Sequence, residues 1–124
     1  MIESGAGSEL NPEQRVDRME KLASHIWMVR TFLKHSEEGE EDDELREVYR
    51  DLYDFLMALG GPQATSGADH YLKLARKKFR KLESARQLFE EIQPEISSHT
   101  NFRMAVQSLN SAVSDFAKLL HPGD

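Results

Sequence analysis

Arg30 and His35 are the pair of side chains in this sequence whose types and spacing could do chemistry together. A guanidinium group can hold a phosphate, and an imidazole can move a proton near neutral pH. Five residues of an ideal helix separate the two side chains by about 140° around its axis. The alternative is a structural role, with Arg30 on the surface and His35 near a helix C-terminus, where a positive charge suits the helix dipole.

Two groups of carboxylates have a spacing that could suit Mg²⁺, which prefers oxygen ligands. Glu37, Glu38 and Glu41 form the pattern E-E-x-x-E, and Asp51 and Asp54 form D-x-x-D further along. The alternative is a solvated acidic face. The histidines are scattered, without the His-x3-His or Glu-x-x-His spacing of a metal-binding bundle. We therefore predict no metal site and no cofactor.

These motifs resemble those of known families. Arg30-x4-His35, within IWMVRTFLKHSEE, resembles the R-x4-6-H motif of the HEPN superfamily, small all-α proteins of which many are metal-independent ribonucleases. That resemblance implies an Arg and a His that face RNA across a dimer interface, although Thr31 stands where the family usually has Asn, Asp or His. The letters E-E-x-x-E resemble the metal-binding motif of all-α nucleoside-triphosphate pyrophosphatases. From HIWMVRTFLKHSEE through SSHTNFRMAV the chain also looks like a family of short bacterial all-α proteins of unassigned role.

The elements that must position these residues are helices. Apolar residues recur at three- and four-residue steps and predict four helices, over residues 12–35, 43–59, 67–92 and 100–120. Asn11, Pro12 and Gln14 are typical of a capped helix start with a capping box. Gly39 should end the first helix, which leaves the acidic run after it as a solvated connection. Pro94 predicts a break or sharp kink at 93–99.

The predicted fold class is all-α: a four-helix antiparallel bundle that forms a single domain over residues 11–121, after a flexible N-terminus at 1–10. The loop at 60–68 should be the internal segment most sensitive to proteases. The core is predicted to include Leu22, Ile26, Leu52, Phe55, Phe79, Leu82, Leu109 and Phe116.

Composition fits one such domain. The chain has 124 residues, 31% of them charged and none of them cysteine, and no apolar run approaches the roughly 20 residues of a membrane span. The absence of a secretory signal pattern and of cysteine leads us to predict a cytoplasmic protein that does not enter membranes. Residues 1–60 carry a net charge of -8 and residues 61–124 a net charge of +2, so the halves should attract each other.

Basic residues cluster on the predicted third helix, with Lys73, Arg76, Lys77 and Arg80 as the candidate basic patch. Such a patch could meet phosphates or an acidic membrane. The alternative, which we favour, is that it pairs with the acidic second helix. The overall negative charge makes nucleic acid an unfavoured partner without excluding it.

Trp27 and Met28 point away from the apolar stripe of the first helix, and Tyr53 and Met57 do the same on the second. If the two helices are neighbours, these four residues form one apolar outer surface, which we predict to be a homodimer interface. The favoured function is therefore a protein-interaction or assembly module and not an enzyme. The alternatives are a HEPN-like ribonuclease that uses Arg30 and His35, or a bundle that binds a small ligand or a metal.

Overall fold

The computed structural model describes residues 10–60 and 67–122. All regular secondary structure in these residues is helical, which confirms the all-α prediction. The described residues form five helices rather than four: α1 (Pro12–Lys34), α2 (Glu37–Glu41), α3 (Asp43–Ala58), α4 (Ala68–Ile96) and α5 (Thr100–Leu120). The predicted flexible N-terminus and most of the predicted protease-sensitive loop lie outside the described residues. Leu10, the last residue of that terminus, packs against the core.

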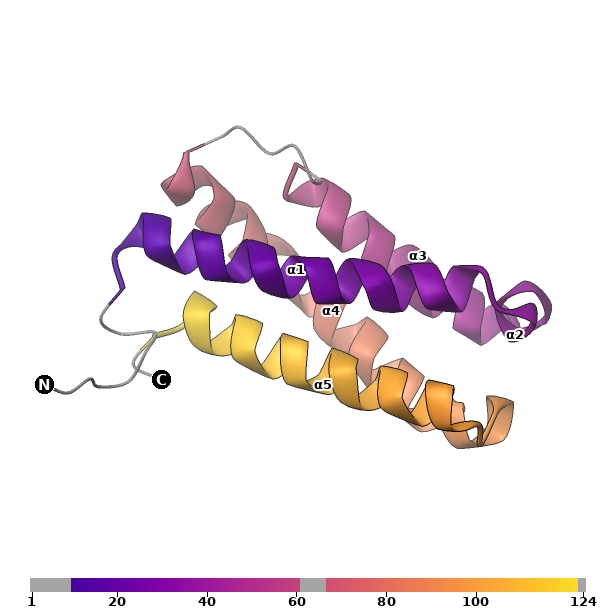
Figure 1. Ribbon diagram of the computed structural model, residues 1–124. Coiled ribbons are helices and arrows are strands. Elements are labelled where there is room, and N and C mark those ends of the chain that lie inside the picture. The colour runs from indigo at the N-terminus through magenta and orange to yellow at the C-terminus, as the bar shows by residue number, and fades with distance from the viewer. Residues whose placement is uncertain (1–9, 61–66, 123–124) are drawn as a thin grey trace, which may run out of the picture.

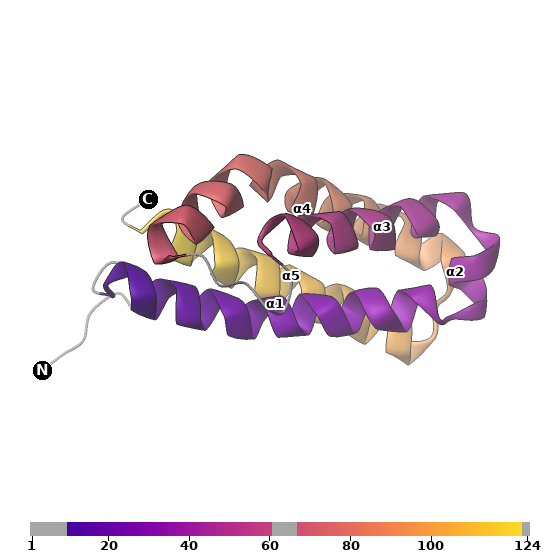
Figure 2. The same cartoon turned by 90° about the horizontal axis from the view of Figure 1, so that it is seen from above.

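The four long helices lie side by side, and each runs in the direction opposite to the long helix before it (Figure 1, Figure 2). α1 packs along α3 and α5, and α4 packs along the same two helices from the other side. The short α2 lies at the end of the molecule opposite the start of α1 (Figure 1). This arrangement makes α1 and α3 neighbours, as the predicted apolar outer surface requires.

The core lies between the long helices and is built around aromatic rings. Phe55 from α3 and Phe79 from α4 both contact the ring of Phe116 on α5, with ring centres 5.5 and 6.4 Å apart respectively. The other predicted core residues that are buried are Ile26, Leu52, Leu82 and Leu109. Leu22 and Phe79 are only partly buried and pack against the edge of the core. The apolar stripes therefore placed most of the core correctly.

α1 begins as its sequence predicts. The side chain of Asn11 accepts a hydrogen bond from the Gln14 amide at 2.8 Å, and the Gln14 side chain accepts one from the Asn11 amide at 3.0 Å. These reciprocal bonds satisfy two amides that a helix start leaves unpaired. The helix ends at Lys34, so His35 is its C-cap and not its last residue.

The acidic stretch after α1 is largely exposed, as predicted, but it forms the short helix α2 rather than a plain connection, and Gly39 does not end α1. α1 has already ended, and Ser36 caps α2 by accepting a hydrogen bond from the Gly39 amide at 2.9 Å. Gly39 is buried, and a Cβ atom at this position would lie 2.1 Å from the Leu33 carbonyl oxygen. A glycine is therefore needed here because α2 folds back closely onto the end of α1. Tyr49 of α3 donates to the Gly39 carbonyl at 3.3 Å and holds α2 from the other side.

The predicted end of the helix at residue 92 is also wrong, since α4 continues through Pro94 to Ile96. A proline lacks one amide and costs one helical hydrogen bond, but here it falls in the last turn. Gln93 is buried, its side chain donates to the Ser97 carbonyl at 2.8 Å, and its carbonyl accepts from the Ser97 amide at 3.0 Å. Ile96 packs against the core. These contacts stabilise the final turn, and the break follows it at residues 97–99.

Arg15 links the first helix to the last. Its Nε and Nη2 atoms donate to the carbonyl oxygens of Leu119 and Leu120 at 2.8 and 3.2 Å. Carbonyls at a helix C-terminus have no partner within the helix and carry its partial negative charge. The guanidinium therefore satisfies the end of α5 from the first turn of α1.

Candidate functional site

The most distinctive cluster on the surface is formed by Trp27 and Arg30 of α1 with Tyr53 of α3, and we call it the aromatic stack. The Trp27 and Tyr53 rings lie 6.1 Å apart between centres. The guanidinium carbon of Arg30 lies 4.8 Å from each ring centre. A cation over an aromatic face contributes about 0.5–2 kcal/mol, depending on its exposure to water. The sequence placed Trp27 and Tyr53 on one surface, but it did not place Arg30 between them.

The charge of Arg30 is compensated by these rings rather than by an acid. No carboxylate in the described residues forms an ion pair with Arg30. Its Nε atom is buried without a hydrogen-bond partner, and Nη1 reaches the Thr31 hydroxyl at 3.5 Å. Buried donors usually find an acceptor. The aromatic stack therefore holds a cation whose charge is not neutralised by a carboxylate of the described residues.

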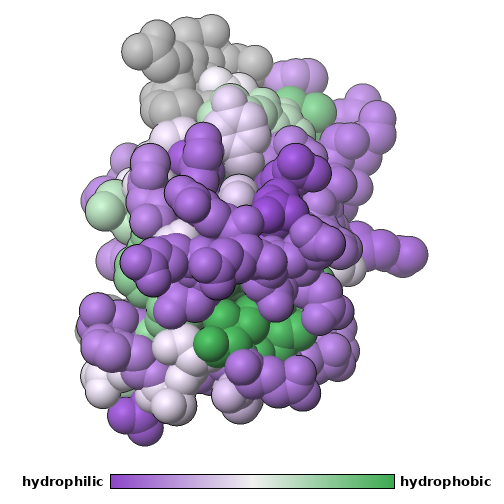
Figure 3. Space-filling view, turned by 90° about the vertical axis from the view of Figure 1, so that its right-hand side faces the viewer, coloured by the Kyte–Doolittle hydropathy of each residue, from purple (hydrophilic) through white to green (hydrophobic). Residues whose placement is uncertain are grey.

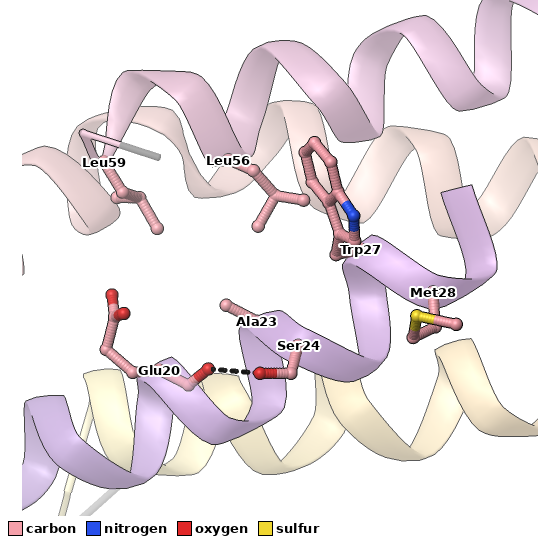
Figure 4. A pocket seen from close by; sticks show the side chains of 7 residues that line it. All are labelled: Glu20, Ala23, Ser24, Trp27, Met28, Leu56 and Leu59. Carbon is pink, nitrogen blue, oxygen red and sulfur yellow. Dashed lines mark hydrogen bonds between the residues drawn. The ribbon is translucent and has the colours of Figure 1, made fainter. Parts of the chain in front are cut away.

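A cavity of about 380 Å³ opens next to the aromatic stack, between α1 and the C-terminal half of α3. Figure 4 shows Trp27 at one end of this α1/α3 cavity and the Glu20 carboxylate at the other. The cavity is lined by Glu20, Ala23, Ser24, Trp27, Met28, Leu56 and Leu59. Its lining is mainly apolar, with one carboxylate and one hydroxyl, a composition common in binding pockets.

The predicted interface residues lie around this cavity to different extents. Met28 lines it and is 63% exposed, and Tyr53 is 39% exposed. Trp27 is half-buried and belongs to both the cavity and the aromatic stack. Met57 is half-buried on α3 and is not among the lining residues. The contact between Trp27 and Tyr53 brings the two helices' candidate residues onto one face.

Arg30 and His35, the candidate catalytic pair, occupy different settings. Arg30 is engaged by the aromatic stack, whereas His35 is exposed at the C-cap of α1. His35 donates its backbone amide to the Thr31 carbonyl at 3.1 Å. Within the described residues, no hydrogen bond joins the Arg30 and His35 side chains. In a single copy, the two side chains are not assembled around one reacting group.

The acidic end of the molecule is a solvated surface. Figure 3 looks onto this end and shows mostly hydrophilic residues, with one group of hydrophobic atoms in its lower half. Glu37, Glu41 and Asp43 are exposed here. Within residues 10–60 and 67–122, no three His, Cys, Asp or Glu side chains are grouped to hold a metal ion. The E-E-x-x-E motif therefore lies in the short helix α2, where its carboxylates are not grouped as metal ligands.

The candidate basic patch is exposed along α4. Its four residues, Lys73, Arg76, Lys77 and Arg80, are all exposed. None of them makes an ion pair with a described residue. The pairing that we favoured between this helix and the acidic second helix is represented by Lys81 and Asp51, whose charged atoms lie 3.5 Å apart. The opposite charges of the two halves therefore meet at a single ion pair in the described part of the chain.

Sequence reasoning missed one polar feature next to the α1/α3 cavity. Tyr71 of α4 is 3% exposed, and its hydroxyl has no hydrogen-bond partner in the described part of the chain. Burial raises the pKa of the Tyr71 phenol, and the nearby Glu20 carboxylate raises it further. No pattern in the sequence links Glu20 to Tyr71, because the two lie on helices that the chain does not connect directly.

Searches of protein-family models, curated proteins and solved structures found no match to this chain. No helix among the described residues is long and apolar enough to cross a membrane.

Proposed function

We propose that the chain is an interaction and assembly module: a four-helix antiparallel bundle, with α2 as a short addition, that forms a homodimer through α1 and α3. The observation that carries this proposal is the aromatic stack beside an open apolar cavity. Trp, Tyr and Arg are the residue types that contribute most at protein interfaces. Here one of each lies within a single contact cluster, and the ring of Tyr53 is partly open to solvent.

Met28 and the cavity supply the shape for self-association. Met28 is the most exposed large apolar residue described, and it stands at the edge of the cavity. A two-fold axis would bring the same surface of two copies together, so a protruding side chain and a hollow on one face can fill each other. Methionine suits such a role because its flexible side chain adapts to irregular spaces. Arg30 stacked on two rings favours a binding role for that residue over phosphate chemistry.

Light scattering on the purified protein tests the proposal. The wild type should be a dimer at tens of micromolar. Met28→Glu and Trp27→Glu should both give folded monomers, because each places a charge where the interface excludes water. Met104→Glu is the matched control, since Met104 is 48% exposed but belongs to α5.

A monomeric wild type at that concentration contradicts the proposal. A dimer that survives Met28→Glu also contradicts it, since Met28 is a surface residue whose substitution should leave the fold intact. Circular dichroism of each variant separates loss of the dimer from loss of the fold.

A further inference from the structure

The α1/α3 cavity has one charged end. Glu20 lies seven residues before Trp27 on α1, which places the two about 10 Å apart along the helix axis. In Figure 4 the Glu20 carboxylate stands at the end near Leu59, and Leu56 and Leu59 form the wall that α3 contributes. Ala23 and Ser24 form the opposite wall. The space between the ends is therefore elongated and apolar.

No cation in residues 10–60 and 67–122 pairs with the Glu20 carboxylate. The Ser24 hydroxyl, which also lines the cavity, donates to the Glu20 backbone carbonyl at 3.2 Å and not to the carboxylate. Glu20 is half-buried, so water solvates its charge only in part. A carboxylate in this setting favours a positively charged partner.

Tyr71 is a second sign that this end of the cavity lacks a polar partner. Its hydroxyl is buried, and no acceptor among the described residues meets it with ordinary hydrogen-bond geometry, although the Glu20 carboxylate is close enough to raise its pKa. Most buried polar groups are hydrogen-bonded, so one without a partner calls for an explanation. A cation bound to the carboxylate would fix the carboxylate's position, and one of its oxygens could then accept from Tyr71.

We propose that the α1/α3 cavity binds a small apolar molecule that carries one amino group. The apolar body packs against Trp27, Leu56 and Leu59, and the ammonium group pairs with Glu20. A volume of about 380 Å³ is at the lower end of the range for small-molecule pockets, which fits a ligand of this kind. Every residue that the inference uses belongs to one copy of the chain. In the proposed homodimer, Met28 of the second copy would enter the same cavity, so the ligand competes with dimer formation and is titrated at protein concentrations where light scattering shows a monomer.

Tryptophan fluorescence provides a direct test, because Trp27 is the only tryptophan in the chain and lines the cavity. The probe is octylamine, and octanol and octanoate are the matched compounds without the positive charge. Octylamine should change the Trp27 emission with saturation. Octanol should bind more weakly and octanoate should not bind, since its charge repels Glu20.

Two substitutions define the site. Glu20→Gln should weaken octylamine binding about tenfold or more, because a hydrogen-bonded charge contributes about 1.5–3 kcal/mol. Glu13→Gln is the control, since Glu13 is exposed on the same helix and does not line the cavity. Ala23→Leu should abolish binding of octylamine and octanol by filling the space. Thermal melting without ligand shows whether each variant is folded.

The proposal fails if none of the three compounds gives a saturable change. It also fails if octanoate binds as tightly as octylamine, or if Glu20→Gln binds octylamine as the wild type does. Light scattering at the same protein concentrations shows whether the assembly state changes during the titration. The failure of this site can therefore be distinguished from the failure of the homodimer.

Discussion

Arg30 shows how one side chain can be held by its surroundings and still remain available. Its guanidinium carbon lies over both rings of the aromatic stack, and no acid in the described residues neutralises it. Trp27 and Arg30 are three residues apart on a helix, so their contact was readable from spacing. The contact of Tyr53 with Arg30 could not be predicted from spacing, because it depends on how α3 packs against α1. The residue-level chemistry of the site is therefore only half encoded in local sequence.

Tyr71 makes a pH-dependent contribution to stability. The folded state raises the pKa of this phenol above the value near 10 of an exposed tyrosine. The folded chain then holds the proton when the unfolded chain releases it, so this stabilisation is complete below pH 10 and is lost as the pH rises above it. We expect wild-type stability, measured by urea unfolding, to fall more steeply than that of Tyr71→Phe between about pH 9.5 and 11.

At neutral pH, Tyr71→Phe should change the free energy of unfolding by less than about 1 kcal/mol, because it removes a hydroxyl that lacks a partner. Tyr53→Phe is the control for both measurements, because it also removes a tyrosine hydroxyl, but from a ring that is partly exposed. Equal slopes for the wild type and Tyr71→Phe above pH 10 would show that the phenol is solvated.

At the scale of elements, the periodic apolar stripes predicted each long helix to within a few residues. The capping residues of α1 predicted where it starts, and its apolar stripe predicted which of its side chains are buried. α2 could not be predicted in the same way, because five residues of Glu and Gly carry no apolar period. Ser36 caps α2 locally, whereas the Tyr49 hydroxyl and the close approach of Gly39 to Leu33 are contacts with other helices. The prediction that α4 ends before Pro94 is wrong for a similar reason. Burial of the neighbouring Ile92 and Gln93 stabilises the last turn more than the one lost hydrogen bond destabilises it.

Gly39→Ala tests the close approach of α2 to α1. The added methyl group would lie 2.1 Å from the Leu33 carbonyl oxygen, a backbone atom that cannot move without disturbing the end of α1. We expect a loss of about 1–3 kcal/mol in the free energy of unfolding, measured by chemical denaturation. Gly67→Ala is the matched control, because a Cβ atom there meets nothing within 4 Å, and its cost should stay below about 1 kcal/mol. Similar losses in both variants would mean that α2 can shift freely.

At the scale of the whole molecule, opposite charges contribute less to the fold than their distribution suggests. The acidic and basic halves differ by ten charges, yet one ion pair, Lys81 with Asp51, links separate helices in the described residues. Exposed pairs of this kind contribute less than about 1 kcal/mol each. The packed apolar faces therefore hold the helices together, and sequence reasoning identified those faces better than it identified the electrostatic contacts.

Arg15 is the polar contact that should matter most for the whole fold. Arg15→Gln removes two hydrogen bonds that a charged group makes to the end of α5, so the free energy of unfolding should fall by about 1–3 kcal/mol. Arg18→Gln is the control, because Arg18 is exposed and makes no ion pair with a described residue. Thermal or urea unfolding of both variants measures the difference. If the two variants are equally stable, the end of α5 is satisfied by water instead.

The packing of α1 along α5 also bears on how the chain folds as it is made. Translation proceeds from the N-terminus, so α1 emerges before α5 and cannot complete its contacts with that helix, such as Phe32 against Phe102, until α5 has been made. α3 arrives early and can cover one side of α1, but the side that faces α5 stays open until translation reaches Leu120. Folding is therefore completed only after translation has produced α5, and during that interval the apolar side of α1 is the surface that a chaperone would meet.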